Sequence, residues 1–421
     1  MTNYNTLGNR LKERLLDFSQ KITINFSKTT RRFITDMLYG MVASNSCKLT
    51  EISRALKEPI ALKKTAERLG RNLSDFSADD RGTLMKDYLA AVKSSIGSDT
   101  MLLIDGGDAI KPCSPKMESI GIVRDASTGE FAPGYWTIGA VALSSENRQP
   151  IPVYENLYPC KKQGGLGANV ETEKCLQHLR EHFAPDVPRV FDRGFDTQRI
   201  VTNLLNNEET FILRVNQNRV AVHKGERGYI HDIARKTVCE HELAYTDKNG
   251  KRVQCKIGIT QVTIPSFCNM KLNVVVCKGY GEALVLYTNL SEPLESFAVR
   301  VVKMFLMRWR IEELYAFKKQ GLNFEDFRVR ELNSIRNLDL LLTVAIGFIS
   351  VLGEQIRSPM AIGLIAASKR IPKINVFLKN TKFPFYAILN GITTVLASLR
   401  CGISRFFAIV PVHRQLSFLA V

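Results

Sequence analysis

Residues 305–319 read F-L-M-R-W-R-I-E-E-L-Y-A-F-K-K, a pattern typical of an amphipathic helix. At about 100° per residue, one strip of roughly 60° carries an aromatic ring, a guanidinium, a carboxylate and an ammonium, from Phe305, Arg308, Glu312 and Lys319. Apolar side chains occupy the opposite side: Met304, Met307, Ile311 and Leu314. We expect these to pack on a core and the charged strip to face away from it. The alternative is an ordinary surface helix with a solvated face.

Length and composition indicate a globular protein of more than one domain. The chain has 421 residues, 45% of them hydrophobic, and a mean hydropathy of -0.07. Its longest apolar run, residues 340–353, is too short to span a bilayer, and the polar and charged residues within 9–14 argue against a signal peptide there. We therefore expect a cytosolic protein with no membrane partner.

The net charge of +17 predicts a polyanionic partner. Lysines and arginines are spread along the whole chain, so the basic field belongs to folded surface and favours nucleic acid. A protein that is merely basic is the alternative.

Residues 1–96 are predicted to be helical, with apolar helical spacing at 7–18 and 30–42. Thr50 is expected to cap a short helix at 51–56, and a turn at 57–59 leads into a second helix at 60–73. We expect a core stripe of Leu62, Ala66, Leu69 and Leu73 in that second helix. Residues 50–73 are thus a candidate helix-turn-helix whose basic side chains would contact DNA: Lys63, Lys64, Arg68 and Arg71. A helical bundle with a solvated basic face is the alternative.

From residue 97 the pattern changes to that of an α/β sheet. An apolar strand at 101–104 ends on D-G-G-D at 105–108, and strand-like runs at 135–143 and 151–158, joined by a polar turn at 144–149, predict an antiparallel meander. A helix is then expected at 170–183.

A second acid follows a second short strand. The strand at 187–191 ends on D-R-G-F-D at 192–196, where Asp196 is expected to cap a helix at 197–206. Ligands of α/β sheets gather at strand ends. Asp105 and Asp192, together with Glu312, form a set of hard carboxylates without His or Cys, which suits Mg²⁺ or Mn²⁺. Three acids can hold two such ions, and two ions support in-line phosphoryl displacement. Each Asp alone is more often a turn former or helix cap.

These blocks together resemble the DDE transposases of bacterial insertion sequences, in particular the insertion-sequence-four group with its Y-R-E-K signature. The resemblance rests on the F-x2-R-x3-E-x6-K spacing, the R-W-R-I-E-E string, the strand into Asp105 and the D-R-G-F-D string, and it spans about residues 100–345. It implies an RNase H-like α/β core with a catalytic, metal-binding triad of Asp105, Asp192 and Glu312.

The resemblance also implies DNA contacts. Arg308 and Lys319 would hold phosphates of the transposon end, Trp309 would lie beside the DNA terminus, and Arg193 and Phe305 belong to the same strings. Phe305 replaces the signature tyrosine and lacks its hydroxyl. Gly106 and Gly107 stand where many relatives have threonines.

The expected organisation is a helical DNA-binding domain (1–96), a catalytic domain (97–213 and 291–345), a β-rich insertion (214–290) and a helical C-terminal region (346–421). The insertion is expected from strand-like runs at 211–215, 242–246, 253–263, 272–277 and 283–287, with a turn at 247–250; an extra sheet that only packs is the alternative. A buried helix is expected at 337–351, and basic stretches lie at 369–370 and 379–382. By resemblance, the last region would serve dimerisation or synapsis.

The function implied is cut-and-paste DNA transposition by endonucleolytic strand cleavage and strand transfer with two Mg²⁺ or Mn²⁺ ions. The partners would be double-stranded transposon ends and target DNA, bound by a homodimer in the bacterial cytosol or nucleoid. A metal-dependent nuclease that cleaves without joining, and a domesticated DNA-binding protein without catalysis, are the alternatives.

Overall fold

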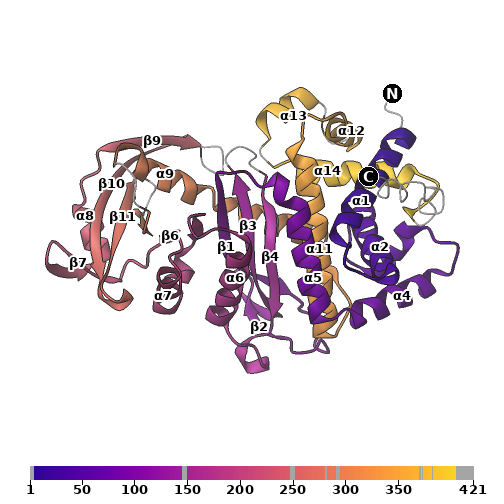
Figure 1. The fold of residues 1–421 in the computed structure, drawn as a ribbon, viewed down its shortest axis with the longest axis horizontal. Helices are drawn as coiled ribbons and strands as arrows, with labels where there is room; N and C mark the ends of the chain where they lie inside the picture. Colours follow the sequence, from indigo (N-terminus) through magenta and orange to yellow (C-terminus); the bar gives the residue numbers. More distant parts are fainter. Residues whose placement is uncertain are drawn as a thin grey trace, which may run out of the picture.

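A computed structural model describes residues 4–144, 149–246, 252–279, 282–290, 294–368, 371, 373–381 and 383–403. N- and C-terminal helices gather at one end, a mixed sheet fills the middle, and a β-rich part forms the other end (Figure 1). The predicted turns at 144–149 and 247–250 and the basic stretches at 369–370 and 379–382 lie wholly or partly outside the described residues.

Five helices open the chain: α1 (Tyr4–Ile22), α2 (Lys28–Ser44), α3 (Leu49–Leu56), α4 (Leu62–Asp75) and α5 (Ala78–Val92). Side-chain caps define two of their starts, because Ser27 accepts from the Thr30 amide and Ser77 forms a capping box with Asp80. The predicted Thr50 cap is wrong: α3 begins at Leu49 with Lys48 at its N-cap and no side-chain cap bond.

The residues of α4 that face the core also differ from the predicted ones. Leu69 and Leu73 are buried as expected, but Leu62 is 39% exposed and Thr65 is buried in its place. The turn before α4 sets its rotation, and Thr65 donates a hydrogen bond to Glu58 in that turn.

The central sheet is built from β1 (Thr100–Ile110), β3 (Phe131–Ser144), β4 (Ile151–Tyr158), β5 (Arg189–Phe191) and β6 (Phe211–Arg214). β1 pairs antiparallel with β3, and β3 with β4, whereas β5 runs parallel to β1, and β6 parallel to β5. The strand order is therefore β4-β3-β1-β5-β6. Helices α6 (Ala168–His182) and α7 (Gln198–Asn206) make the crossovers, and β2 (Gly121–Arg124) pairs with β3.

The predicted strand at 101–104 is confirmed, but it does not end at Asp105. Gly106 and Gly107 pair with Ile138 and Thr137 of β3, so the ladder continues to Ile110. The glycines therefore lie within a strand, where the absence of side chains opens space above the sheet.

The β-rich part extends this sheet and does not form a second one among the described residues. It contains β7 (Val220–His223), β8 (Glu226–Tyr229), α8 (Ile230–Lys236), β9 (His241–Thr246), β10 (Arg252–Ile264), β11 (Met270–Lys278) and β12 (Leu284–Thr288). β12 pairs antiparallel with β6, giving one 12-stranded sheet within the described chain.

The predicted single helix at 305–319 is wrong. α9 (Leu294–Leu306) ends and α10 (Trp309–Gln320) begins around a turn in which the Arg308 amide donates to the Phe305 carbonyl at 2.9 Å. Phe305 therefore belongs to the last turn of α9, where it is 8% exposed in the core and not on a strip shared with Glu312.

The remaining helices are α11 (Leu332–Glu354), α12 (Pro359–Ala367), α13 (Ile374–Asn380) and α14 (Phe385–Ser398). Short 3-10 turns are η1 (Lys93–Ser95), η2 (Lys161–Gln163), η3 (Arg193–Phe195), η4 (Pro265–Phe267) and η5 (Phe324–Asp326). By length and composition α11 could cross a membrane, but 83% of its most apolar window is buried inside the protein. It packs against β4 and against helices α2, α4, α5 and α14, so the predicted buried helix is confirmed and is longer than expected.

A buried charge cluster joins α10 to the sheet and to α11. The Lys318 ammonium lies 2.8 Å from Glu155 of β4 and also contacts Asp339 of α11. One cation thus faces two buried carboxylates, and burial raises the pKa of Glu155 to about 7 and that of Asp339 above its usual range.

This cluster predicts a pH-dependent stability. The raised pKa means that folded Glu155 keeps a proton that the unfolded chain releases above about pH 4.5, so stability is highest below that pH and is lost as pH rises through about 7. In Glu155→Gln, the melting temperature should vary less across this window and at about pH 8 should be no lower than in the wild type. A steeper loss in the variant would contradict the assignment.

Candidate active site

The sheet brings the first two predicted acids together. In the β1–β5 ladder Ile104 is the partner of Phe191, and Asp105 and Asp192 are the next residues on the two parallel strands. Glu312, in the first turn of α10, completes the group from the helical side. The three predicted acids are therefore neighbours.

Arg308 lies at the centre of these acids. Its guanidinium contacts Asp105, lies 2.5 Å from Glu312 Oε1 and 3.9 Å from Asp192 Oδ2. Its side chain is only 12% exposed, whereas that of Glu312 is 47% exposed. One cation therefore gathers three carboxylates at a partly buried position, and Arg214 of β6 approaches Asp192 to 3.6 Å from the other side.

The carboxylates carry more negative charge than Arg308 balances. Burial raises the pKa of Asp105 to about 6, Arg308 opposes the rise, and Asp192 and Glu312 add to it. Burial acts to lower the pKa of Arg308, but the three carboxylates outweigh it and raise that pKa. Asp192 Oδ1 is buried without a hydrogen-bond partner. The group therefore has excess negative charge, and one of its oxygens has no hydrogen bond, although Arg214 lies 3.6 Å from that oxygen.

Tyr315 fixes α10 on β1, three residues after Glu312. Its hydroxyl donates to the Asp105 carbonyl at 2.8 Å, and burial keeps its pKa well above the usual range, so it remains a donor. Two glycines make room for the ring: a Cβ at Gly139 would lie 2.7 Å from the Tyr315 hydroxyl, and one at Gly107 would lie 3.5 Å from the ring. The acids are thus positioned by a helix resting directly on the strand backbone.

Lys319 lies on the same side of α10, as its spacing predicts, but it contacts protein groups. Its ammonium contacts Asp108 of β1 and lies 2.9 Å from Glu325 of η5. The strip that the sequence places in solvent therefore faces β1 instead. The reason is that β1 offers acids and glycines, which a charged helix face can pack against.

The other predicted contacts from these strings are spread around the site. Trp309 is the first residue of α10, is half-buried, and lies under the Arg310 guanidinium at 5.3 Å from the ring. Arg193 of η3 is 40% exposed and lies 3.5 Å from Glu282. The expectation that Phe305 faces the DNA is corrected by its burial, although Arg308 lies 6.0 Å from its ring centroid.

The basic residues predicted on α4 differ in their surroundings. Lys63, Lys64 and Arg71 are exposed. Arg68 instead donates to Asp36 and Glu58 at 3.0 Å, and both of these acids are buried. Burial raises the pKa of Asp36 to about 6 against the effect of Arg68. The charge of Arg68 is therefore balanced inside the helical part.

Sequence reasoning missed Tyr315, Asp108 and Arg214. A signal existed for Tyr315, because it lies three residues after Glu312 and four before Lys319 and so shares their helix face. Asp108 also had a signal, as the second acid of D-G-G-D. The sequence contains no comparable signal for Arg214, because only the parallel β5–β6 pairing brings this residue beside Asp192.

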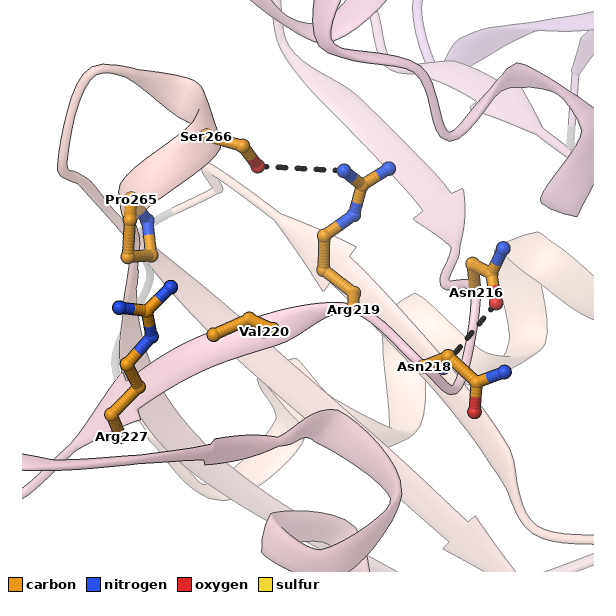
Figure 2. A pocket seen from close by; sticks show the side chains of 7 residues that line it. All are labelled: Asn216, Asn218, Arg219, Val220, Arg227, Pro265 and Ser266. Atoms are coloured by element: carbon orange, nitrogen blue, oxygen red, sulfur yellow. Dashed lines mark hydrogen bonds between the residues drawn. The ribbon is translucent and has the colours of Figure 1, made fainter.

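A cavity of about 420 Å³ in the β-rich part contains none of the three acids. Figure 2 shows Arg219 reaching towards Ser266. The Arg219 guanidinium donates a hydrogen bond of 3.4 Å to the Ser266 hydroxyl. Arg219 also lies 2.7 Å from Asp196, which in addition accepts from the Asn216 amide. The predicted cap at Asp196 is therefore wrong, and Thr197 caps α7 through the Ile200 amide.

No protein-family model matches the chain. One solved structure with a similar arrangement is the cryo-EM structure of a piggyBac transposase synaptic complex with hairpin DNA. The alignment has a TM-score of 0.43 at 9% identity and covers 98% of this chain and 86% of that one.

The close approach of α10 to β3 gives a test of the site's construction. In Gly139→Ala the new methyl would lie 2.4 Å from Glu155 and 2.7 Å from the Tyr315 hydroxyl, so both must move. We expect a loss of about 1 to 3 kcal/mol in the free energy of unfolding, measured by urea denaturation.

Gly82→Ala is the matched control, because it lies exposed in α5 with nothing within 4 Å of its Cβ position. Alanine there should be neutral or add up to about 1 kcal/mol. Equal stabilities of the two variants would mean that α10 does not rest on Gly139.

Proposed function

We propose that this chain is a metal-dependent DNA transposase whose catalytic acids are Asp105, Asp192 and Glu312. The observation that carries the proposal is the convergence of these three carboxylates, from two neighbouring strands and one helix, on a single guanidinium. Arg68 and Lys318 each face two acids inside the fold, whereas Arg308 faces three acids that follow two neighbouring strands and begin a helix, which is the arrangement of a functional-site candidate.

The strand order supports an RNase H-like core for this activity. An antiparallel meander followed by two parallel strands, in the order β4-β3-β1-β5-β6, has its first acid on the central strand and its second at the end of the parallel neighbour. The proposed catalytic domain comprises residues 97–213 and 291–345, and residues 214–290 would be its insertion.

The donor set fits divalent magnesium or manganese. Asp105, Asp192 and Glu312 would hold the ions, and Asp192 Oδ1, which makes no hydrogen bond and lies 3.6 Å from Arg214, would be one ligand atom. Two such ions supply charge stabilisation to the attacking and leaving oxygens of phosphoryl transfer.

The surrounding side chains have supporting roles in the proposal. Tyr315 orients the Asp105 backbone, and Lys319 ties Asp108 and Glu325 to α10. Arg308 competes with a metal for the carboxylates, and whenever they take up another cation its guanidinium becomes available for a phosphate. Trp309 and Arg193 are proposed to contact DNA beside it.

DNA is the proposed substrate because the chain carries a net charge of +17. Residues 1–96 would supply sequence-independent and end-specific contacts, with α3 and α4 as a helix-turn-helix. A homodimer on the two transposon ends, a role in synapsis for residues 346–421 and a place in the bacterial cytosol belong to the same proposal.

The triad is tested by single substitutions. Asp105→Ala, Asp192→Ala and Glu312→Gln should each abolish cleavage of a plasmid carrying the flanking ends in Mg²⁺, with end binding in gel shifts largely retained. Glu130→Gln, an exposed acid after β2, is the control and should cleave normally. Glu313 is unsuitable as a control because it balances the buried Arg310.

Robust cleavage by Glu312→Gln would refute the triad. The same reaction separates the alternatives: joined target products indicate a transposase, cleavage without joining a nuclease, and binding without cleavage a DNA-binding protein.

Substitutions of the basic residues of α4 should have two different effects, because three of these residues are exposed and Arg68 is ion-paired inside the fold. Three substitutions of exposed residues should leave the stability unchanged: Lys63→Ala, Lys64→Ala and Arg71→Ala. Each should lower, by about 0.9, the steepness with which log K for DNA binding falls with log salt concentration. Arg68→Ala should instead destabilise the fold by about 3 kcal/mol, because it leaves Asp36 and Glu58 buried with less compensation. Unchanged slopes for the three exposed variants would exclude α4 from the DNA interface.

A further inference from the structure

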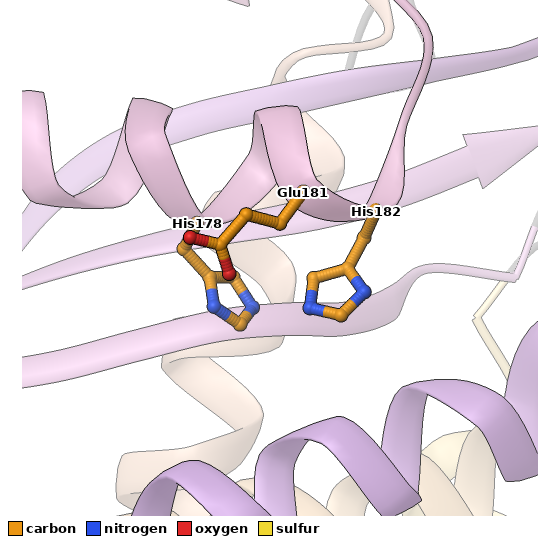
Figure 3. A group of neighbouring side chains, drawn as sticks. All are labelled: His178, Glu181 and His182. Atoms are coloured by element: carbon orange, nitrogen blue, oxygen red, sulfur yellow. The ribbon is translucent and has the colours of Figure 1, made fainter.

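A second group of side chains, at the end of α6, has the composition of a transition-metal site. His178, Glu181 and His182 lie in its last turns, and their ligand atoms are all within 4.8 Å of one another. Figure 3 shows the two imidazoles side by side and the Glu181 carboxylate folded back beside His178. The i, i+4 spacing of the histidines brings both rings to one face of the helix.

The ring of His178 is oriented by the sheet. The Val153 carbonyl accepts a hydrogen bond from it, and its Nε2 is buried without a hydrogen-bond partner. Val153 is the residue that the bulge in β4 leaves unpaired, between Pro152 opposite Val141 and Tyr154 opposite Ala140. Nδ1 therefore carries the proton and Nε2 the free lone pair, which is the arrangement that metal-binding histidines adopt.

The three side chains line a cavity of about 520 Å³. Basic residues also line it, but two of them have other partners: Arg81 donates to Asn333 and Asn337 at 2.6 and 2.7 Å, and Arg336 donates to the Leu157 carbonyl at 2.9 Å. Glu181 and His182 are exposed, so their side chains are able to close on an ion.

We propose that His178, Glu181 and His182 bind one divalent transition-metal ion of the zinc type. Two imidazole nitrogens and one carboxylate favour Zn²⁺, Co²⁺ or Ni²⁺ over Mg²⁺, and three protein ligands leave further positions open to water. The ion would fasten the end of α6 to the bulge of β4 through His178. This site is separate from the three acids. The end of α6 leads into the start of β5, whereas Asp192 follows the end of β5.

The test is titration of the full chain with Zn²⁺ by calorimetry, with Co²⁺ absorption as a probe of nitrogen ligands. With the acidic site disrupted by Asp105→Ala, we expect one ion per chain and a melting temperature that rises with Zn²⁺ concentration. His182→Ala and Glu181→Gln alter exposed residues and should fold normally but lose more than about tenfold in affinity. His178→Ala should also lose binding.

Gln177→Ala, an exposed neighbour on the same helix, is the matched control and should bind as the wild type does. Asp105→Ala should also keep the Co²⁺ spectrum, because the acids are not part of this site. Equal affinity of His182→Ala and Gln177→Ala, or the absence of a bound ion in the wild type at micromolar Zn²⁺, would overturn the proposal.

Discussion

The contact between α10 and the backbone of β1 is the constraint on which the site depends. A helix can approach a sheet this closely only where the strands carry no side chains, and Gly107 and Gly139 supply that space beneath Tyr315. The hydroxyl of Tyr315 then reaches the Asp105 carbonyl, and Glu312, one turn earlier, shares the Arg308 guanidinium with the Asp105 carboxylate. The position of one acid relative to another is thus fixed by backbone contact and not by flexible side chains.

Neighbouring cations reduce the charge repulsion within this arrangement. Three carboxylates repel one another, and the raised pKa of Asp105 records that repulsion together with burial. Arg308 reduces it by contacting all three, while Lys319 and Lys318 do the same for the acids on either side of it. Lys318 and Lys319 of α10 therefore compensate acids of the sheet and of adjoining segments, whereas Arg310 pairs with Glu313 of the same helix. These ion pairs add to the apolar packing of the buried Ile311, Leu314 and Phe317.

The sequence predicted the strands of the central sheet well because they depend on local pattern, and the three acids that it selected lie next to one another in the structure. Apolar runs of strand length identified β1, β3 and β4, and an acid at the end of such a run identified Asp105 and Asp192. The predictions that were wrong concern features that depend on tertiary contacts. Helical periodicity does not reveal the break at Arg308, and it assigned the charged side of α10 to solvent because it contains no information about acids on β1. The buried state of Phe305 and the internal pairing of Arg68 were missed for the same reason. The histidines of α6 were overlooked because i, i+4 spacing alone is common on surface helices.

The β-rich part is connected to the site as well as to the sheet. Because β12 pairs with β6, the segment before β12 is carried back towards the end of β5, and Glu282 there lies 3.5 Å from Arg193 and 4.0 Å from Arg214. Arg214 is in turn 3.6 Å from Asp192. A chain of alternating charges therefore runs from the insertion to the second acid. Glu282 is 60% exposed, so this link is weak in water and is open to competition by another anion. Under the proposed DNA-binding function, a phosphate approaching Arg193 and Arg214 would compete with Glu282 for both guanidiniums, and the insertion would then be part of the proposed DNA-contacting surface beside Asp192.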